Sequence, residues 1–188
     1  MTQPRPITER PVKMANTLPT ELSPLQTAAL RVATEETVPS FTYGGTRVPA
    51  RVLRVVDGDT VIVAIYVGVA APALCAYRCR LVGINTPERH PHRVKPDAIR
   101  EALGPDATEA EITAAVGKAT DERNAIIAAA NAATAALSAY LGGDGLVELT
   151  LDGFGNFGRP LVTLARPGAE KSANAMLLEA GHAAPYRR

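Results

Sequence analysis

Apolar and polar positions along the chain follow two kinds of pattern, and each predicts its own kind of element. Short apolar runs rich in β-branched residues, and one run at residues 146–151 in which apolar and polar residues alternate, predict five strands. These strands are expected at residues 47–56, 60–67, 75–84, 146–151 and 161–164. Between the third and the fourth strand, apolar residues recur at every third or fourth position, which predicts helical structure.

Capping and stop signals bound four predicted helices. Their starts are expected at Ser23, Gly104, Thr120 and Ser172. Their ends are expected before Pro39, near Val116, at Gly142 and at Gly181. The inward-facing residues of the last two helices should be Ile126, Ala130, Ala133, Leu137 and Tyr140, and then Met176, Leu177 and Ala180.

The first part of the chain differs from the rest. Residues 1–22 are rich in Pro, Thr and charge, and we interpret them as an extended arm. The helix that follows carries Leu25 and Val32 on one face, and either packs on the strand domain or docks on a protein partner. Packing is the simpler interpretation. The expected parts are an arm with a short helix at residues 1–40 and a domain at residues 41–188, with a helical insertion at about residues 104–118.

The composition favours a globular core and argues against binding by charge alone. Hydrophobic residues make up 46% of the chain and charged residues 21%, as in packed domains. The net charge is only +1, whereas sequence-independent binding to nucleic acid scales with the number of neutralised phosphates. With 4% aromatic residues and no Trp, an extended base-stacking platform is not expected. A local basic groove is still compatible with these values.

Neither a signal peptide nor an apolar run of membrane-spanning length stands out. We therefore expect a cytoplasmic protein that makes no contact with a membrane. Cys75 and Cys79 lie four residues apart in one predicted strand, or about 13 Å at about 3.3 Å per residue, too far for a disulfide. Both are expected to be buried thiols in a reducing compartment and not metal ligands.

Polar clusters at the ends of strands supply the candidate chemistry. The Asp57-Gly58-Asp59 cluster separates the first two strands and indicates a tight turn or bulge. Arg80 lies in the third strand, and Glu88 follows the proline that closes this segment. Carboxylates and a guanidinium brought together at strand ends could hold a metal ion and a phosphate.

These clusters resemble the motifs of the thermonuclease (staphylococcal nuclease-like) family. The matching strings are DGDT at residues 57–60, RLVGINTPE at 80–88, GNFGR at 155–159 and SANAMLLEAGHA at 172–183. Any one string is weak, but the four in order make a specific match over about residues 47–186, with one insertion. The resemblance implies an α+β fold, a five-stranded OB-fold barrel with about three packed helices. The strand pattern alone supports only a small α+β barrel or sandwich.

The resemblance also implies a nuclease site. Glu88 would be the general base that polarises the attacking water. Arg80 and Arg159 would grip the scissile phosphate, because a guanidinium can donate two parallel hydrogen bonds to phosphate oxygens. Outside these motif positions, a solvated glutamate and two surface ion pairs would be the simpler interpretation.

A divalent cation would be the cofactor, Ca²⁺ by resemblance, with Mg²⁺ as the other hard cation that oxygen ligands suit. The expected ligands are the side chains of Asp59 and Asn85 and the main-chain carbonyl of Thr86. Asp57 would support the ligands from outside or simply form the turn. Thr60 is expected to be structural.

Two departures from the family pattern bear on the function. Asn85 stands where the family usually has a metal-binding aspartate, so one negative charge is lost and cation binding should be weaker. The loop before Arg159 reads Gly-Asn-Phe-Gly, where the family more often has an acidic residue and a tyrosine. Tyr186 and Arg187 would supply aromatic and basic contacts to a nucleotide.

Metal-dependent hydrolysis of phosphodiester bonds in DNA or RNA is therefore the expected function. The alternative is a non-catalytic OB-fold module that binds nucleic acid or a protein partner, with the N-terminal arm as one docking element. The presence of a base at Glu88 favours the enzyme, because a binding module needs none. Asn85 and the unmatched arm favour the module.

Overall fold

The computed structural model describes residues 23–34, 36–37, 44–67, 73–155 and 158–186. The chain divides into two compact units. One comprises Met1–Ser40 with Gly68–Pro72, and the other comprises Phe41–Val67 with Ala73–Arg188. All strands of the described residues, and all the described candidate site residues, belong to the second unit.

In the first unit the described residues form one short helix, α1 (Pro24–Val32). Its start is at Ser23, whose carbonyl oxygen accepts hydrogen bonds from the backbone N–H and the hydroxyl of Thr27, at 2.9 and 3.1 Å. The helix predicted after Ser23 is therefore confirmed. Leu25 and Val32, on its predicted apolar face, are 81% and 76% exposed, so this face contributes little to a core.

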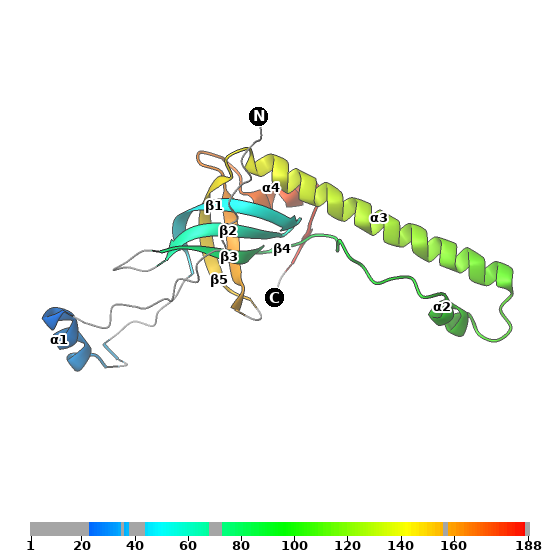
Figure 1. Cartoon of the computed structure of the whole chain (residues 1–188), viewed down its shortest axis with the longest axis horizontal. Coiled ribbons are helices and arrows are strands. Elements are labelled where there is room, and N and C mark those ends of the chain that lie inside the picture. Colours follow the sequence, from blue (N-terminus) through cyan, green and yellow to red (C-terminus); the bar gives the residue numbers. More distant parts are fainter. Residues whose placement is uncertain (1–22, 35, 38–43, 68–72, 156–157, 187–188) are drawn as a thin grey trace, which may run out of the picture. The chain divides into compact units, whose positions relative to one another are not determined.

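The second unit is built on a closed five-stranded barrel (Figure 1). Its strands are β1 (Thr46–Asp57), β2 (Thr60–Val67), β3 (Ala73–Leu81), β5 (Leu146–Phe154) and β6 (Pro160–Ala165). The order around the barrel is β1-β2-β3-β6-β5, and only β3 and β6 run parallel. Outside it, β4 (Ile84–Asn85) pairs with β7 (Ala184–Pro185). The predicted α+β barrel is confirmed, with each strand within three residues of its expected bounds.

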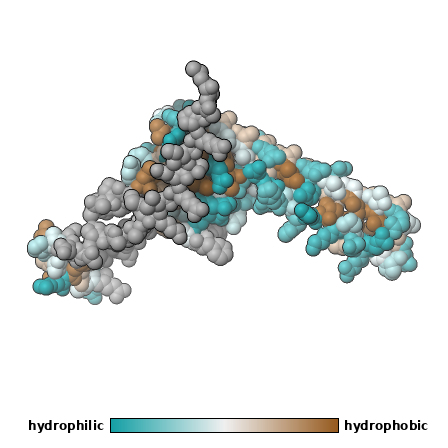
Figure 2. Space-filling view, viewed as in Figure 1, coloured by the Kyte–Doolittle hydropathy of each residue, from teal (hydrophilic) through white to brown (hydrophobic). Residues whose placement is uncertain are grey.

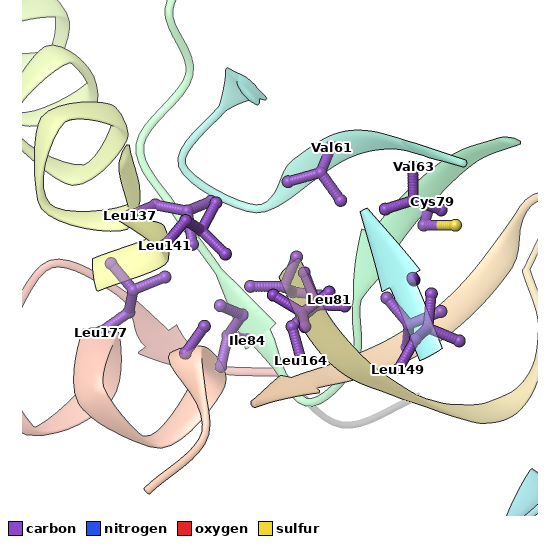
Figure 3. Close-up of a cluster of buried hydrophobic side chains, with 14 residues drawn as sticks. Val61, Val63, Cys79, Leu81, Ile84, Leu137, Leu141, Leu149, Leu164 and Leu177 are labelled. Carbon is purple, nitrogen blue, oxygen red and sulfur yellow. The ribbon is translucent and has the colours of Figure 1, made fainter. Parts of the chain in front are cut away.

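The core joins the interior of the barrel to two helices, α3 (Glu109–Leu141) and α4 (Ala173–Glu179). Figure 3 shows the buried side chains that meet there, with Val61, Val63, Leu81, Leu149 and Leu164 coming from the barrel strands and Leu137, Leu141 and Leu177 from the helices. Burying one such side chain fully is worth about 1.5–3 kcal/mol. The end of the barrel that carries Ile84 is therefore fixed against both helices.

Helix α3 differs from the prediction, because it runs without a break over 33 residues, about 50 Å at 1.5 Å per residue. The prediction of two separate helices, at residues 104–116 and 120–141, is therefore wrong. Gly117 lies inside α3, and the Thr120 hydroxyl donates to the Val116 carbonyl at 2.7 Å instead of capping a new helix.

The start of α3 is a capping box at Thr108. The Thr108 hydroxyl accepts from the backbone N–H of Glu111, and the Glu111 carboxylate accepts from the backbone N–H of Thr108. Ahead of it lies a helix that the sequence pattern did not predict, α2 (Pro96–Leu103), which packs on α3. Its first residue is a proline, a residue favoured at that position.

Only the C-terminal part of α3 packs on the barrel, where it contacts β1 and α4. Ala130, Ala133 and Leu137 are fully buried there, as expected, and Tyr140 packs against the core. Ile126 is 41% exposed, so the expectation that it faces inward is wrong. The face of α3 that is buried on the barrel therefore ends between Ala130 and Ile126.

Among the described residues, α3 is long and apolar enough to cross a membrane on length and composition. The expectation that no run approaches that length is therefore corrected. One such helix is weak evidence for a span, since core helices of soluble proteins meet the same criteria. In the space-filling view, the hydrophobic residues along α2 and α3 form separate patches among hydrophilic ones (Figure 2).

The last helix, α4, starts at Ser172 as predicted, and the Ser172 hydroxyl accepts from the backbone N–H of Ala175. Leu177 is fully buried and Met176 packs against the core. Ala180 is exposed and caps the helix, so its predicted inward position is wrong.

Both cysteines lie in β3 and neither forms a disulfide. Cys79 is buried, and burial raises the pKa of its thiol from 9.0 to about 11. It therefore stays protonated at neutral pH, as an inert core residue does. Cys75 is only half-buried, so the expectation of two buried thiols holds for one of them.

Candidate active site

The turn between β1 and β2 places Asp59 at the mouth of the site. Asp57 pairs with Thr60 across the turn, and its carboxylate accepts from the backbone N–H of Asp59 at 3.2 Å. Gly58 has no room for a side chain, because a Cβ there would lie 2.7 Å from Cβ of Ala133 and 2.8 Å from Cγ2 of Thr86. The long helix and the Thr86 segment therefore press on this turn from two sides.

Asp59 is a buried carboxylate, 4% exposed, with hydrogen bonds to both of its oxygens. Oδ1 accepts from the Thr60 hydroxyl at 3.1 Å and from Nη1 of Arg80 at 2.9 Å. Oδ2 accepts from the backbone N–H of Thr86 at 3.1 Å. The Thr60 hydroxyl therefore supports Asp59, and the Asp57 carboxylate supports the turn.

Arg80 is the centre of this cluster, because one guanidinium bridges two candidate ligands. Nη1 donates to Asp59, and Nη2 donates to Oδ1 of Asn85 at 2.7 Å. The guanidinium carbon lies 5.9 Å from the centre of the Tyr186 ring, within the range of a cation–π contact. The register of the barrel produces this arrangement, since Arg80 pairs with Thr60 directly beside Asp59.

Burial raises the pKa of the Asp59 carboxyl above its ordinary value of 3.8. This effect outweighs the hydrogen bond from Thr86 and the charge of Arg80, both of which lower the pKa. The surroundings of Asp59 therefore oppose its ionisation overall, although a cation lies against it.

The side-chain oxygens of Asp59 and Asn85 converge on one cation, which in this structure is the Arg80 guanidinium. They are hard oxygen donors of the kind that Ca²⁺ and Mg²⁺ take. The residues therefore fit a divalent cation in donor type, although such a cation would share Asp59 and Asn85 with the Arg80 guanidinium or replace it there. Within the described part of the chain, no group of three or more His, Cys, Asp or Glu side chains could hold a metal. The available anionic charge is low.

Beside this cluster lies a cavity of about 310 Å³ into which a second arginine reaches. Its lining includes Arg80, Asn85, Arg159 and Tyr186, together with the backbone of Gly83 and Gly155. Among the described residues, Nε of Arg159 is buried and has no hydrogen-bond partner. Leaving such a donor without a partner costs about 1–3 kcal/mol, so an acceptor atom of a ligand would be favourable here.

The structure does not bring Glu88 into this cluster. Glu88 is exposed, and its carboxylate accepts a hydrogen bond from the backbone N–H of His90 at 3.4 Å. It does not line the cavity that holds the two arginines. The same segment is anchored by Arg89, whose Nη1 donates to the Val56 carbonyl at 2.7 Å.

Tyr186 lies beside Arg80 and lines the same cavity, while Arg187 falls outside the described residues. The backbone N–H of Tyr186 donates to the Gly83 carbonyl at 2.9 Å. The pairing of β4 with β7, which holds the C-terminal segment in this position, was not predicted from the sequence.

Asn174 is a supporting residue that the sequence analysis missed. It is buried, its Nδ2 donates to the carbonyls of Val82 and Val162, and its Oδ1 accepts from the backbone N–H of Leu164. It therefore holds the end of β3, next to Gly83, against β6. An Asn just after the Ser172 cap was the only signal for it, and that signal is not specific.

No protein-family model and no curated protein matches this chain.

Proposed function

We propose that this protein is a divalent-cation-dependent hydrolase of phosphodiester bonds in DNA or RNA, a nuclease of the thermonuclease-like type that its motifs resemble. The observation that carries the proposal is that Arg80 and Arg159 line one cavity, beside Asp59 and Asn85. Two guanidiniums at one cavity are suited to a phosphate diester, whose charge grows in the transition state.

The arginines would bind the phosphate from two sides. Arg159 brings a donor that has no partner among the described residues. Arg80 can turn toward a phosphate because its guanidinium already borders the cavity, at the cost of its bonds to Asp59 and Asn85. Tyr186 would offer its ring to the neighbouring base or sugar.

Glu88 is the proposed general base. It would take a proton from water as the water oxygen bonds to phosphorus and the bond to the leaving sugar oxygen breaks. Its exposed position suits a base only if substrate binding draws its carboxylate toward the phosphate, since catalytic contacts often form only in the complex.

A divalent cation would be held by Asp59, Asn85 and the Thr86 carbonyl, and would supply charge neutralisation at the phosphate. Ca²⁺ is the cation that the resemblance implies, and Mg²⁺ suits the same oxygen ligands. With one carboxylate in the set, the affinity is expected to be weak.

A non-catalytic OB-fold module that binds nucleic acid or a protein is the second candidate, and one specific observation favours it. Asp59 and Asn85 both accept hydrogen bonds from Arg80, and Glu88 is not part of the cluster. Such a site could serve binding alone.

A cleavage assay separates the two candidates. Labelled single-stranded and duplex oligonucleotides would be incubated with the protein and with Glu88→Gln, over a titration of Ca²⁺ and of Mg²⁺. The nuclease predicts cleavage that needs cation and falls at least a hundredfold in Glu88→Gln, as loss of a general base implies. Oligonucleotide binding without cleavage at any cation concentration would favour the module.

A further inference from the structure

The outer face of β1, β2 and β3 carries arginines in neighbouring rows. Arg54, Ile62 and Arg78 lie opposite one another across the three strands. In the next row, Arg51 lies beside Ala64, and Ala76 completes the row. Arg51, Arg54 and Arg78 are all exposed, and we call these three residues the outer arginine track.

The track has no negative partner among the residues that the structure describes. None of its three guanidiniums has an ion pair or hydrogen bond within the described part of the chain. By contrast, Arg47 on the same strand is paired with Glu148 at 3.5 Å. The acidic residue of these three strands, Asp57, and Asp59 in the turn that follows it both belong to the candidate active site. The described residues therefore leave the charge on this face uncompensated, although the net charge of the chain is only +1.

The track leads to the active site. Along β2, the row that contains Arg54 and Arg78 is followed by the row in which Thr60 pairs with Arg80. At the other end, Tyr66 pairs with Leu74, and these side chains are 67% and 61% exposed. From Thr60 to Tyr66 the face extends about 20 Å at about 3.3 Å per residue.

We propose that this face binds an extended single strand of nucleic acid and leads it to the cavity between Arg80 and Arg159. The proposal rests on the proposed nuclease function and names the form of its substrate. Phosphates would lie against the track, and unpaired bases would lie on Tyr66 and Leu74. A duplex keeps its base faces stacked inside, so it could use the charge but not the exposed ring.

The test measures oligonucleotide binding in the full-length protein without divalent cation, which keeps the strand intact. A fluorescein-labelled dodecamer of thymidine is titrated at several salt concentrations, and its anisotropy is followed. Arg51→Gln/Arg54→Gln/Arg78→Gln should lower the salt slope of log K by about 2, because each lost phosphate contact on a single strand removes about 0.7. The matched control is Arg100→Gln/Lys118→Gln/Lys171→Gln, which removes the same charge at exposed residues with carboxylate partners.

A smaller slope in the track variant alone supports the proposal, and equal slopes in the track and control variants overturn it. Tyr66→Ala should weaken binding of the single strand about fivefold or more, as loss of a stacking contact implies. It should leave binding of a duplex of the same length unchanged. Equal losses on both substrates, or tighter binding of the duplex by the parent protein, would show that the face does not select single strands.

A small substrate separates this proposal from the proposed function. Bis(p-nitrophenyl) phosphate is too short to reach the track, so its hydrolysis should be the same in the parent and the track variant. Suppose that neither the parent nor the track variant hydrolyses bis(p-nitrophenyl) phosphate or the dodecamer, but the dodecamer still binds through the track. The nuclease proposal then fails and the proposed binding face stands. If the parent hydrolyses the small substrate and the salt slope of log K is unchanged in the track variant, the nuclease proposal stands and the proposed binding face fails.

Discussion

The two halves of the candidate site are built in opposite ways. In the aspartate half, Asp59 is buried and both of its oxygens accept hydrogen bonds, from Thr60, Arg80 and Thr86. In the arginine half, Arg159 lines the cavity and has a buried Nε without a partner among the described residues. In the aspartate half the described residues supply hydrogen bonds to both oxygens of Asp59, whereas in the arginine half Nε of Arg159 could still donate to a ligand. This difference predicts which substitutions affect folding and which affect function alone.

The largest effect should come from the two arginines. Arg159→Ala and Arg80→Ala should each reduce cleavage by about 100- to 1000-fold, because each would stabilise charge in the transition state. Only Arg80→Ala should also lower the free energy of unfolding, by about 2 kcal/mol, because it leaves the Asp59 carboxylate without a charged partner. Single-turnover cleavage and urea unfolding measure the two quantities. Equal loss of stability in both variants would contradict the comparison.

Gly58→Ala should damage the aspartate half through packing. The new Cβ would lie 2.7 Å from Cβ of Ala133, and overpacking of this kind costs about 1–3 kcal/mol. Urea unfolding of the variant tests this. Gly143→Ala is the matched control, because a Cβ there meets nothing within 4 Å. If both variants unfold at the same urea concentration, the turn is not wedged between α3 and Thr86.

Asn85→Asp should change the charge of the aspartate half without changing its shape. A second carboxylate should raise cation affinity roughly tenfold, since affinity for hard cations follows ligand charge. Calorimetric titration with Ca²⁺ gives the affinity, and cleavage at low cation concentration should rise with it. Asn131→Asp adds the same charge on the exposed surface of α3 and should change neither quantity. Tighter cation binding with no cleavage in either protein would favour the binding module.

The pKa of Asp59 predicts a pH trend. Because burial raises this pKa in the folded protein, the stability gained by holding the proton is complete below the unfolded value of 3.8 and is lost as the pH rises through the folded pKa. Asp59→Asn does not titrate, so its free energy of unfolding relative to the parent should increase from acid to neutral pH. Urea unfolding at several pH values gives this difference.

The smallest effect should follow from removing residues 1–40, which make up the first unit except for its internal segment Gly68–Pro72. A chain that begins at Phe41 should fold and keep both halves of the site, because every site contact described above lies within the second unit. Circular dichroism and cleavage by the shortened chain test this. An insoluble product would show that residues 1–40 belong to the core.

The barrel could be predicted because its strands carry strong local signals. The β-branched run at residues 60–67 and the turn residues Asp57-Gly58-Asp59 set the hairpin of β1 and β2 without help from distant residues. The long helix was divided wrongly because Gly117 and Thr120 resemble a stop and a cap. The capping box from Thr108 to Glu111 and the helix propensity of the alanines outweigh one internal glycine.

The site was predicted as a set of residues but not as a network. Motif order places Asp59, Arg80 and Asn85 near one another, yet the bridge that Arg80 forms between the two others depends on the register of β2 with β3. Two features could not be predicted from the sequence: the exposed position of Glu88, and the Nε of Arg159 without a partner among the described residues. Both depend on the conformation of loops around the barrel.

The bridge formed by Arg80 has a thermodynamic consequence. The same guanidinium holds Asp59 and Asn85, so a ligand that draws it away releases two oxygens at once. An anion at Arg80 and a cation at those oxygens are therefore linked, and each must raise the affinity for the other by the same factor. That reciprocity follows from a shared set of bonds and requires no motion elsewhere in the fold.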